Sequence, residues 1–405
     1  MMHKDMCIQY KDAVINKRTQ CSVCDNRELI EIMNMPELPI TGLFSKEKQK
    51  DSFSGIDQSL LWCSKCGQGQ LLNQVNPEIL YDSQKYTFRT SLSSTAQQGT
   101  KVFIDYLREF VPDEKFNCII DVGCNDLYLL HEIKSFGKVR IGLDPIWTSQ
   151  ENNIKDSDLH VIGGTVEETD LDKVLPCKPD CILSRHTLEH IFDPQLVLEK
   201  LIDCATDDAL FLFEIPGFDS LITRGRFDQV FHEHLQYFSL SSFEALLNKL
   251  GAKLIGYHEN YHNWGALMIA FRKKGAAHRN FNVAFTREDI EWRRDLFFCQ
   301  MDNARKTLYE FKNTNIYGYG AALMLPVLAY HLKSDLSFIK AVIDDDKDKE
   351  GFFYTNLPLQ VKHSGSIEDF YSSTVFVTAI DNVKPIMLKL LQNRPKHIIY
   401  PLHII

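Results

Sequence analysis

Seven short β-rich runs that alternate with segments of helical period set the narrowest limit on how this chain can fold. The runs are CIIDVG (118–123), VRIGLDP (139–145), HVIGGT (160–165), DCILSRH (180–186), ALFLFEIP (209–216), AKLIGYHE (252–259) and ALMIAFRK (266–273). Segments of helical period, such as 194–204 and 241–250, separate most of them. This alternation predicts a mainly parallel sheet covered by helices on both faces, with the last two runs paired antiparallel at one edge.

The first of these runs leads into a glycine turn, IIDVGCND (119–126), of the kind that holds a nucleotide. Asp121 and Gly123 stand where the backbone can approach a ligand closely and where the next helix offers free amide donors. The turn lacks the full G-x-G-x-x-G pattern, which argues against a dinucleotide and for a smaller nucleoside. Asp144 ends the second run, where a carboxylate can hold both ribose hydroxyls. In the alternative interpretation, Asp121 and Asp144 only cap loops. Seven strands with a terminal hairpin fit a class I (Rossmann-like) methyltransferase core.

Two Cys-x-x-Cys pairs, Cys21/Cys24 and Cys63/Cys66, precede this core. Each pair presents two soft sulfurs on one tight turn, and four thiolates suit a tetrahedral Zn²⁺ ion. A site made of four cysteines is closed to water and substrate, so we predict a structural zinc. The alternative is four unrelated thiols. The segment between the pairs contains prolines and glycines, which predicts turns and short strands.

Composition excludes several classes of partner. The formal net charge is -9 and no dense run of Lys or Arg occurs, which disfavours nucleic acid and favours a small-molecule substrate. No apolar run reaches the roughly eighteen residues needed to span a bilayer. Eleven cysteines in a chain that begins MMHKDMCIQYK, without an apolar signal segment, predict a reducing compartment and therefore a cytoplasmic location. Nothing in the sequence indicates an oligomeric state.

The second half of the chain predicts a long helix followed by another α/β unit. Thr286 and Asp289 have the spacing of a capping box, and apolar residues then recur at three- and four-residue steps up to Phe311. IYGYGAA (316–322) begins a second unit of strands and helices. We therefore divide the chain into a polar tail (1–18), a zinc-binding domain (19–94), a methyltransferase domain (95–275), a linker helix (276–312) and a C-terminal Rossmann-like α/β domain (313–405).

Histidines gather after two consecutive strands of the predicted core, in HTLEHIFDP (186–194) and FDQVFHEHLQYFS (227–239). The carboxyl ends of strands are where open α/β sheets place ligands. The H-E-H sequence offers no pair of histidines at i and i+4, so we favour acid–base chemistry over an active-site metal. A histidine that titrates near pH 7 can remove a proton from a hydroxyl or an acidic carbon. Any single histidine here could instead be structural.

Taken in order, these motifs resemble the sugar C-methyltransferases that act on nucleotide-linked deoxysugars. That family has a zinc-binding N-terminal domain, a class I S-adenosylmethionine domain and a Rossmann-like C-terminal domain. The resemblance covers nearly the whole chain and is carried by the paired cysteine hooks, PELPITGLF, YDSQKYTFRTSLS, DVGCND, FDQVFHEHLQYFS, and GYGAA with VIDDDKDKEGFFYTNLPL.

The resemblance implies roles for particular residues. His234 would be the general base that removes a proton beside a keto group, giving an enolate that takes the methyl group. Glu233 would be its polar partner, and His190 and Tyr86 would lie around the keto sugar. The cofactor-binding residues implied in this way are Asp121, Gly123, Cys124, Asn125 and Asp144. The C-terminal domain would help to grip the nucleotide of the substrate.

Three residues depart from the family pattern. Phe231 and Phe88 stand where tyrosines are expected, and Leu127 stands where a glycine is expected after the turn, with its backbone amide still available. Losing one oxyanion donor typically costs about 3–4 kcal/mol of barrier. Two alternatives therefore stand beside carbon methylation: O-methylation of a sugar by the same histidine, and a non-catalytic protein that binds a nucleotide sugar.

Overall fold

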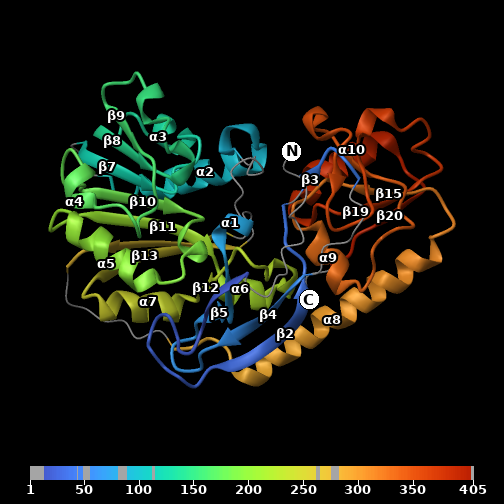
Figure 1. Ribbon diagram of the computed structural model, residues 1–405, viewed down its shortest axis with the longest axis horizontal. Helices are drawn as coiled ribbons and strands as arrows, with labels where there is room; N and C mark the ends of the chain where they lie inside the picture. The colour runs from blue at the N-terminus through green and yellow to red at the C-terminus, as the bar shows by residue number, and fades with distance from the viewer. Residues whose placement is uncertain are drawn as a thin grey trace, which may run out of the picture.

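The computed structural model describes residues 13–42, 44–48, 55–80, 89–111, 115–260, 265–274 and 282–402. Figure 1 shows two α/β units side by side, the first in green and the second in orange and red, with the blue N-terminal strands below and between them. The long helix α8 (Arg287–Glu310) runs along the underside of the molecule into the second unit. The chain thus forms two sheet-based lobes on a shared base.

The first lobe is built on a seven-stranded sheet in the order β13-β14-β11-β10-β7-β8-β9. Its strands are β7 (Phe116–Val122), β8 (Gly137–Leu143), β9 (Leu159–Ile162), β10 (Cys181–Arg185), β11 (Leu210–Pro216), β13 (Lys253–Asn260) and β14 (Ala266–Arg272). β14 pairs antiparallel with both β11 and β13, and the other pairings are parallel. This order, with one reversed strand, is that of a class I methyltransferase, and all seven predicted strands are confirmed.

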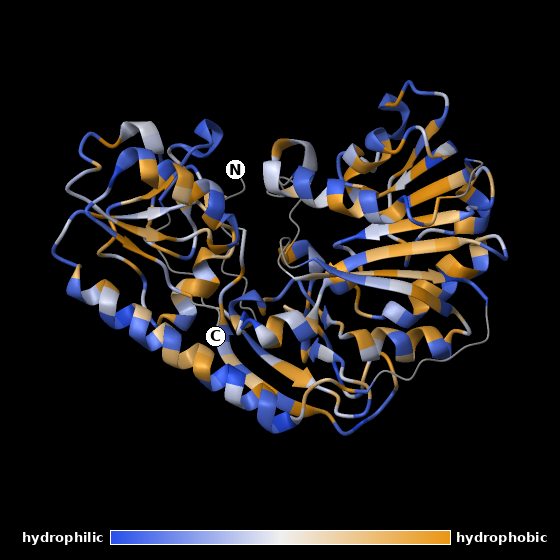
Figure 2. Ribbon diagram, turned by 180° about the vertical axis from the view of Figure 1, so that it is seen from behind, coloured by the Kyte–Doolittle hydropathy of each residue, from blue (hydrophilic) through white to orange (hydrophobic). Residues whose placement is uncertain are grey.

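Helices cover both faces of this sheet because its strands are apolar on both sides. Ile120 and Ile182 pack into one core, whereas Ile119 and Leu183 pack into another. The helices are α2 (Ser94–Leu107), α3 (Tyr128–Glu132), α4 (Leu171–Val174), α5 (Pro194–Cys204) and α7 (Leu240–Lys249). Helix α6 (Phe218–Thr223) instead packs into the core that includes the N-terminal sheet. Figure 2 shows the strands of this sheet mostly in the orange of hydrophobic residues. The buried strands account for the continuous apolar runs in the sequence.

The N-terminal strands do not form an isolated module. A four-stranded sheet has the order β12-β5-β4-β2, and its edge strand β12 comes from the first lobe. Its members are β2 (Ile30–Leu38), β4 (Ile56–Trp62), β5 (Gly69–Leu71) and β12 (Gln236–Tyr237), and α1 (Pro77–Leu80) follows. β1 (Val14–Lys17) pairs with β6 (Asn73–Val75), so the prediction of a polar tail is wrong for 14–17. We keep the other domain boundaries as predictions.

The second lobe is a five-stranded sheet in which every pairing is parallel. Its order is β18-β16-β15-β19-β20, from β15 (Ile316–Tyr319), β16 (Val342–Asp344), β18 (Val361–His363), β19 (Thr374–Val377) and β20 (His397–Ile399). Its helices are α9 (Leu325–His331) and α10 (Val383–Asn393). The short strands β3 (Phe44–Ser45) and β17 (Phe353–Tyr354) pair and attach this lobe to the N-terminal strands. This is the predicted Rossmann-like arrangement.

Helix α8 begins as predicted. The Thr286 side chain accepts a hydrogen bond from the Asp289 amide at 3.2 Å, and the Asp289 carboxylate accepts one from the Thr286 amide at 2.9 Å, which completes the capping box. Buried Phe297, Met301 and Leu308 belong to a core that also includes residues of the N-terminal sheet and of the second lobe. Helix α8 therefore packs against both the N-terminal sheet and the second lobe, and does not serve only as a linker.

The remaining short helices are single 3₁₀ turns. They are η2 (Thr90–Leu92), η3 (Pro145–Trp147), η4 (Glu151–Asn153), η5 (Leu188–His190), η6 (Phe227–Gln229), η7 (Lys347–Lys349), η8 (Ser364–Ser366) and η9 (Ile380–Asn382). Within the described ranges, no helix has both the length and the apolar character required to cross a bilayer.

Candidate active site

The four predicted zinc ligands lie together. The Sγ atoms of Cys21, Cys24, Cys63 and Cys66 all lie within 4.8 Å of one another. Cys21 Sγ is 3.6 Å from Cys66 Sγ, and the Cys24–Cys63 distance is also 3.6 Å. Four sulfurs at these separations, on two tight turns, fit the tetrahedral shell of a Zn²⁺ ion.

The cysteine cluster is tied to the loop that carries His234. The Ser22 hydroxyl and the Gln68 amide both donate to Gln236 Oε1, at 2.8 and 3.1 Å, and Gln236 is fully buried. The Ser241 hydroxyl donates to the Cys66 carbonyl oxygen at 2.9 Å. A metal bound by the cysteines would therefore stabilise the segment between η6 and α7 as well as the N-terminal sheet.

The glycine turn forms at the end of β7. Gly123 has φ +77°, a conformation that favours glycine, and an added Cβ would lie 1.9 Å from Thr187 Oγ1. Asp121 is buried, and its Oδ1 has no hydrogen-bond partner among the described residues. Burial, partly opposed by Arg185, raises the pKa of the Asp121 carboxyl to about 8. A buried acceptor beside a close backbone approach fits a site for the amine and sulfonium of S-adenosylmethionine.

The other residues predicted to bind the cofactor have mixed roles. The Asp144 carboxylate caps η3 by accepting from the Ile146 amide at 3.0 Å, and it also accepts from the Asn125 amide at 2.9 Å. The Asn125 carbonyl oxygen accepts from the Trp147 indole at 2.7 Å. The Cys124 side chain is buried in the core. Asp144 and Asn125 thus stand at the turn, while Cys124 could contact a ligand through its backbone only.

Leu127 corrects one sequence-based expectation. Its amide donates to the Cys124 carbonyl oxygen at 2.9 Å, so it is not available to a ligand. Leu127 also has φ +66° and a buried side chain. The side chain lies against Gly142, where a Cβ would be 2.8 Å from Leu127 Cδ2. Burial of the isobutyl group offsets the cost of a left-handed backbone at the position where the family has glycine.

A substitution at Gly123 measures how much the close approach of its backbone contributes to cofactor affinity. We expect Gly123→Ala to lower the affinity for S-adenosylhomocysteine at least about tenfold, or 1.4 kcal/mol, in isothermal titration. The matched control is Gly251→Ala, because Gly251 has φ +69° but no atom within 4 Å of its virtual Cβ. The control should lower the melting temperature through the backbone cost of about 1–2 kcal/mol and leave cofactor affinity unchanged. Equal affinities in the two variants would contradict the assignment of Gly123.

The predicted histidines meet at the carboxyl edge of the first sheet. The rings of His190 and His234 are 4.9 Å apart between centroids and nearly perpendicular. His190 Nδ1 lies 2.8 Å from the Glu233 carbonyl oxygen. Burial, reinforced by His190 and His186, lowers the pKa of His234 well below its ordinary value. His234 is therefore a neutral imidazole at pH 7, in the form that can accept a proton.

The neighbours of His234 in sequence face elsewhere. His232 is buried in the N-terminal sheet, where Nε2 lies 3.0 Å from the Leu38 carbonyl oxygen and burial lowers its pKa to about 4. The Glu233 carboxylate accepts a hydrogen bond from the Thr41 hydroxyl. Thus the structure places the Glu233 side chain against Thr41, and its carbonyl, not its carboxylate, contacts the histidine pair. Tyr86, with Phe88, lies outside the described residues.

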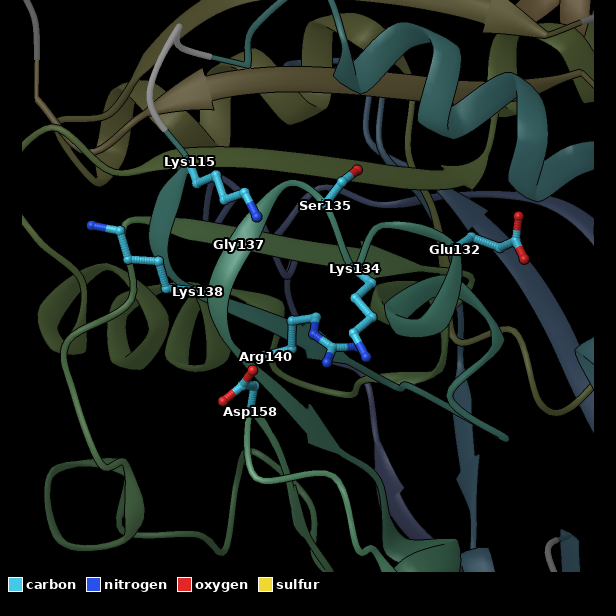
Figure 3. A pocket seen from close by; sticks show the side chains of 8 residues that line it. All are labelled: Lys115, Glu132, Lys134, Ser135, Gly137, Lys138, Arg140 and Asp158. Carbon is cyan, nitrogen blue, oxygen red and sulfur yellow. The ribbon is translucent and has the colours of Figure 1, made fainter.

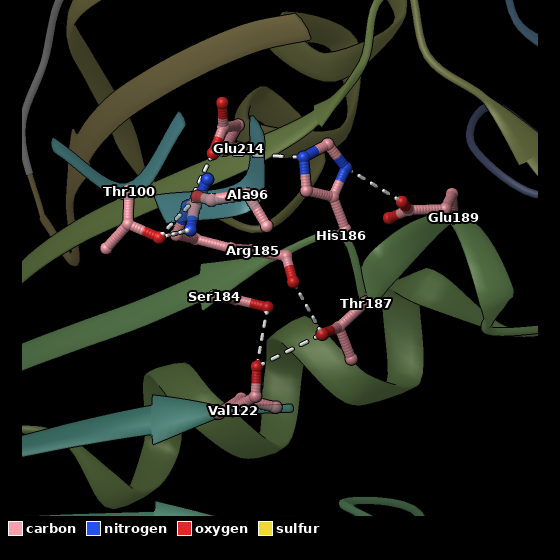
Figure 4. A network of polar contacts seen from close by, with 9 residues as sticks. All are labelled: Ala96, Thr100, Val122, Ser184, Arg185, His186, Thr187, Glu189 and Glu214. Carbon is pink, nitrogen blue, oxygen red and sulfur yellow. Dashed lines mark hydrogen bonds and ion pairs between the residues drawn. The ribbon is translucent and has the colours of Figure 1, made fainter. Parts of the chain in front are cut away.

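A network of charged side chains behind the histidines was not predicted (Figure 4). Arg185 pairs with the buried Glu214 at 2.5 Å and donates to the Thr100 hydroxyl at 2.6 Å. His186 lies between Glu214, at 3.9 Å, and Glu189, at 3.4 Å, and it has φ +51°. Glu189, His190 and His234 also bring one ligand atom each within 4.8 Å of the others. Glu189 was visible in the HTLEH motif, but only the fold places it beside His234.

A second polar depression lies away from this site (Figure 3). It is lined by residues at the amino ends of the first-lobe strands, including Lys115, Lys138 and Asp158. Arg140 at its base pairs with Asp156 at 2.9 Å. In an open α/β sheet, ligands bind at the opposite, carboxyl edge, where the glycine turn and the histidines lie.

The sheet order, the glycine turn and a family match together identify residues 96–256 as an S-adenosylmethionine-dependent methyltransferase domain. Comparison with known families agrees. Residues 96–256 match a family described as "methyltransferase domain", and residues 21–81 match one described as "putative zinc binding domain". The predicted combination of a methyltransferase domain with a zinc-binding type of N-terminal domain is confirmed.

One curated relative is a C-methyltransferase. The chain is 22% identical over 268 residues to the C-methyltransferase NovU of Streptomyces niveus, a match that covers 65% of this chain and 63% of the relative. The match thus spans less than two thirds of that relative's length. This relationship confirms the resemblance to C-methyltransferases that the motifs indicated.

Solved structures with a similar fold include the YcgJ protein of Bacillus subtilis, with 14% identity, 44% of this chain and 100% of that chain covered, and a TM-score of 0.34. N-methyltransferase NodS of Bradyrhizobium japonicum has 8% identity, 44% and 88% coverage and a TM-score of 0.34. The fold assignment rests on the sheet order and the family match.

Proposed function

We propose that this protein transfers a methyl group from S-adenosylmethionine to a carbon beside the keto group of a nucleotide-linked deoxysugar, with His234 as the general base. The observation that carries the proposal is the path from the glycine turn to His234. Thr187 lies against Gly123, and His190, three residues further on, lies against His234. The cofactor turn and the base therefore belong to one continuous edge of the sheet.

The residues present fit both implied groups. S-adenosylmethionine, when bound at the glycine turn, would supply an electrophilic methyl group, with Asp121 near its charged end and Asp144 near its ribose. Zn²⁺ would be held by Cys21, Cys24, Cys63 and Cys66 and would have a structural role, because these four thiols leave no open position. Reduced thiols at this site fit a cytoplasmic location.

His234 would take the proton from the carbon beside the keto group. The electron pair of that C–H bond would remain on the substrate as an enolate, whose carbon would accept the methyl group that bound S-adenosylmethionine supplies, with the electrons of the S–CH₃ bond left on sulfur. His190, fixed through Nδ1 by the Glu233 carbonyl, would present its other nitrogen toward the sugar. Tyr86 is the other residue that we propose to lie around the keto sugar.

The second lobe is suited to hold the nucleotide of the substrate. Gly320 has φ +96° and its virtual Cβ lies 2.3 Å from the Ala379 Cβ, so this turn also requires glycine. The Asp344 carboxylate accepts from the Ala321 amide at 2.7 Å, which orders the turn at the end of β15. Contacts between Thr95 and Asn382, at 2.7 Å, and between Arg226 and Asp381, at 2.7 Å, join this lobe to the first.

Sugar O-methylation by the same histidine is the second candidate. The Phe231 ring lies 4.2 Å from His234, at the position where the family has a tyrosine hydroxyl. A phenyl ring there cannot stabilise an enolate, whereas deprotonation of a sugar hydroxyl needs no such donor. A protein that binds a nucleotide sugar without catalysis is the third candidate.

A panel of nucleotide-linked deoxysugars tests the proposal. With purified protein and S-adenosylmethionine, we expect a keto sugar nucleotide to gain the mass of one CH₂ and the same compound with its keto group reduced to be inert. Turnover of the reduced compound would favour O-methylation. Binding in isothermal titration without turnover of any member would favour the non-catalytic candidate.

A further inference from the structure

Glu189 is a buried carboxylate that the proposed chemistry does not yet use. It lies in η5 and its side chain is fully buried. Neither of its carboxylate oxygens receives a hydrogen bond from any residue that the structure describes. A carboxylate in that position is costly unless a positive charge approaches it. Its near neighbours are three imidazoles, those of His186, His190 and His234.

The cluster formed by Glu189, His186, His190 and His234 carries more negative than positive charge when its histidines are neutral. Arg185 and Glu214 form an ion pair and neutralise each other. Within the part of the chain that the structure describes, no salt bridge to Lys or Arg compensates Glu189, as long as the histidines are neutral. Glu233, the other carboxyl nearby, is held by Thr41. The Thr41 hydroxyl is neutral and does not compensate a charge on Glu233. Among the described residues, the site is therefore short of at least one positive charge, which a proton on the histidine cluster would provide.

We propose that Glu189 is a positioning residue that stabilises the imidazolium formed on His234 when it takes the substrate proton. The inference rests on the proposed function and assigns to Glu189 the partner role that the family resemblance gave to Glu233. Its carboxylate oxygen and a ring nitrogen of His234 lie within 4.8 Å. At such a separation a carboxylate favours the charged form of its neighbour.

Glu189 stabilises His234 only while the substrate proton is being transferred to it. In the resting enzyme His234 is neutral, so Glu189 makes no ion pair with it. As the C–H bond breaks, the proton moves to His234 and positive charge develops next to Glu189. An interaction that is stronger at that stage than in the ground state lowers the barrier. Afterwards the proton passes to water and the cluster returns to its resting charge.

A titration of His234 by NMR tests this without any sugar substrate. With ¹⁵N-labelled histidine, we expect Glu189→Gln to lower the pH at which His234 gains its proton by about 1–2 units, and Glu189→Asp to lower it less. Glu168→Gln, at an exposed position, is the matched control and should leave the titration unchanged. An unchanged His234 titration in folded Glu189→Gln would overturn the proposal.

A second measurement links the cluster to catalysis. With a keto sugar nucleotide that the native enzyme methylates and S-adenosylhomocysteine in D₂O, deuterium uptake beside the keto group reports proton removal alone. We expect Glu189→Gln to slow this uptake about tenfold for each unit by which the His234 pKa falls, with KM unchanged, and Glu189→Asp to restore part of the rate. Uptake at the native rate would also reject the proposal.

Two further results would distinguish a failure of the proposed function from a failure of the role proposed for Glu189. Undiminished exchange in His234→Ala would overturn the proposed function itself and leave Glu189 no base to serve. Added Mn²⁺ that broadens the His190 and His234 signals in native protein but not in Glu189→Gln would identify a metal centre. In that case Glu189 would be a ligand and the proposal would be wrong.

Discussion

His234→Ala is expected to lower kcat for methyl transfer by about 10²–10⁴-fold, the usual contribution of a positioned general base. The affinity for S-adenosylhomocysteine should stay unchanged, because the three atoms nearest the Cβ position of Gly123 all belong to Thr187. The two measurements are a single-turnover assay on a keto sugar nucleotide and isothermal titration of the cofactor product.

The control for this variant is His232→Ala, two residues away. His232 is buried and contacts the Leu38 carbonyl, so its removal should lower the melting temperature while the folded fraction keeps its kcat. If His234→Ala retained native kcat, or if His232→Ala matched its loss, the base would have to be sought elsewhere in the cluster.

Cys63→Ser should have the largest effect on folding. Structural zinc sites contribute about 10–16 kcal/mol of apparent binding free energy in small peptides, so loss of one thiolate should remove much of the stability of the N-terminal sheet. Because Gln236 and Ser241 are bonded to this region, the disturbance should reach the His234 loop. We expect elemental analysis to find one zinc per native chain and less than half of that in the variant.

Cys299→Ser is the control variant, since Cys299 is exposed on α8 and lies far in sequence from the two Cys-x-x-Cys pairs. It should keep the zinc and the native melting temperature. Native protein that contains no zinc after purification without chelators would refute the assignment of the four cysteines.

The extent of sequence-based prediction differed between elements for physical reasons. The strands of the first lobe are apolar on both faces, as at Ile119 and Ile120, so each appears as a continuous run that needs no partner to be recognised. Helices α5 and α8 begin at side-chain caps, at Asp193 and Thr286, which are local signals.

Pairing between strands that are far apart in the sequence could not be predicted from local patterns. β12 has only two residues and exists because Gln236 and Tyr237 pair with Gln70 and Gly69, far earlier in the chain. The strand Val14–Lys17 was not predicted because the segment 1–18 is polar and has no clear period, which agrees with the exposure of three of its four residues. The available amide predicted for Leu127 is in fact used inside its own turn.

The sequence by itself determined the class of fold, the four sulfur ligands and the segments that carry the chemistry, because periodicity, caps and Cys-x-x-Cys spacing are encoded within a few residues. Only the tertiary structure decided which carboxylate accompanies His234. Glu233 is adjacent in sequence, yet its side chain turns toward Thr41, whereas Glu189 arrives from another strand end. The direction of a side chain depends on the packing of distant elements, which no local pattern records.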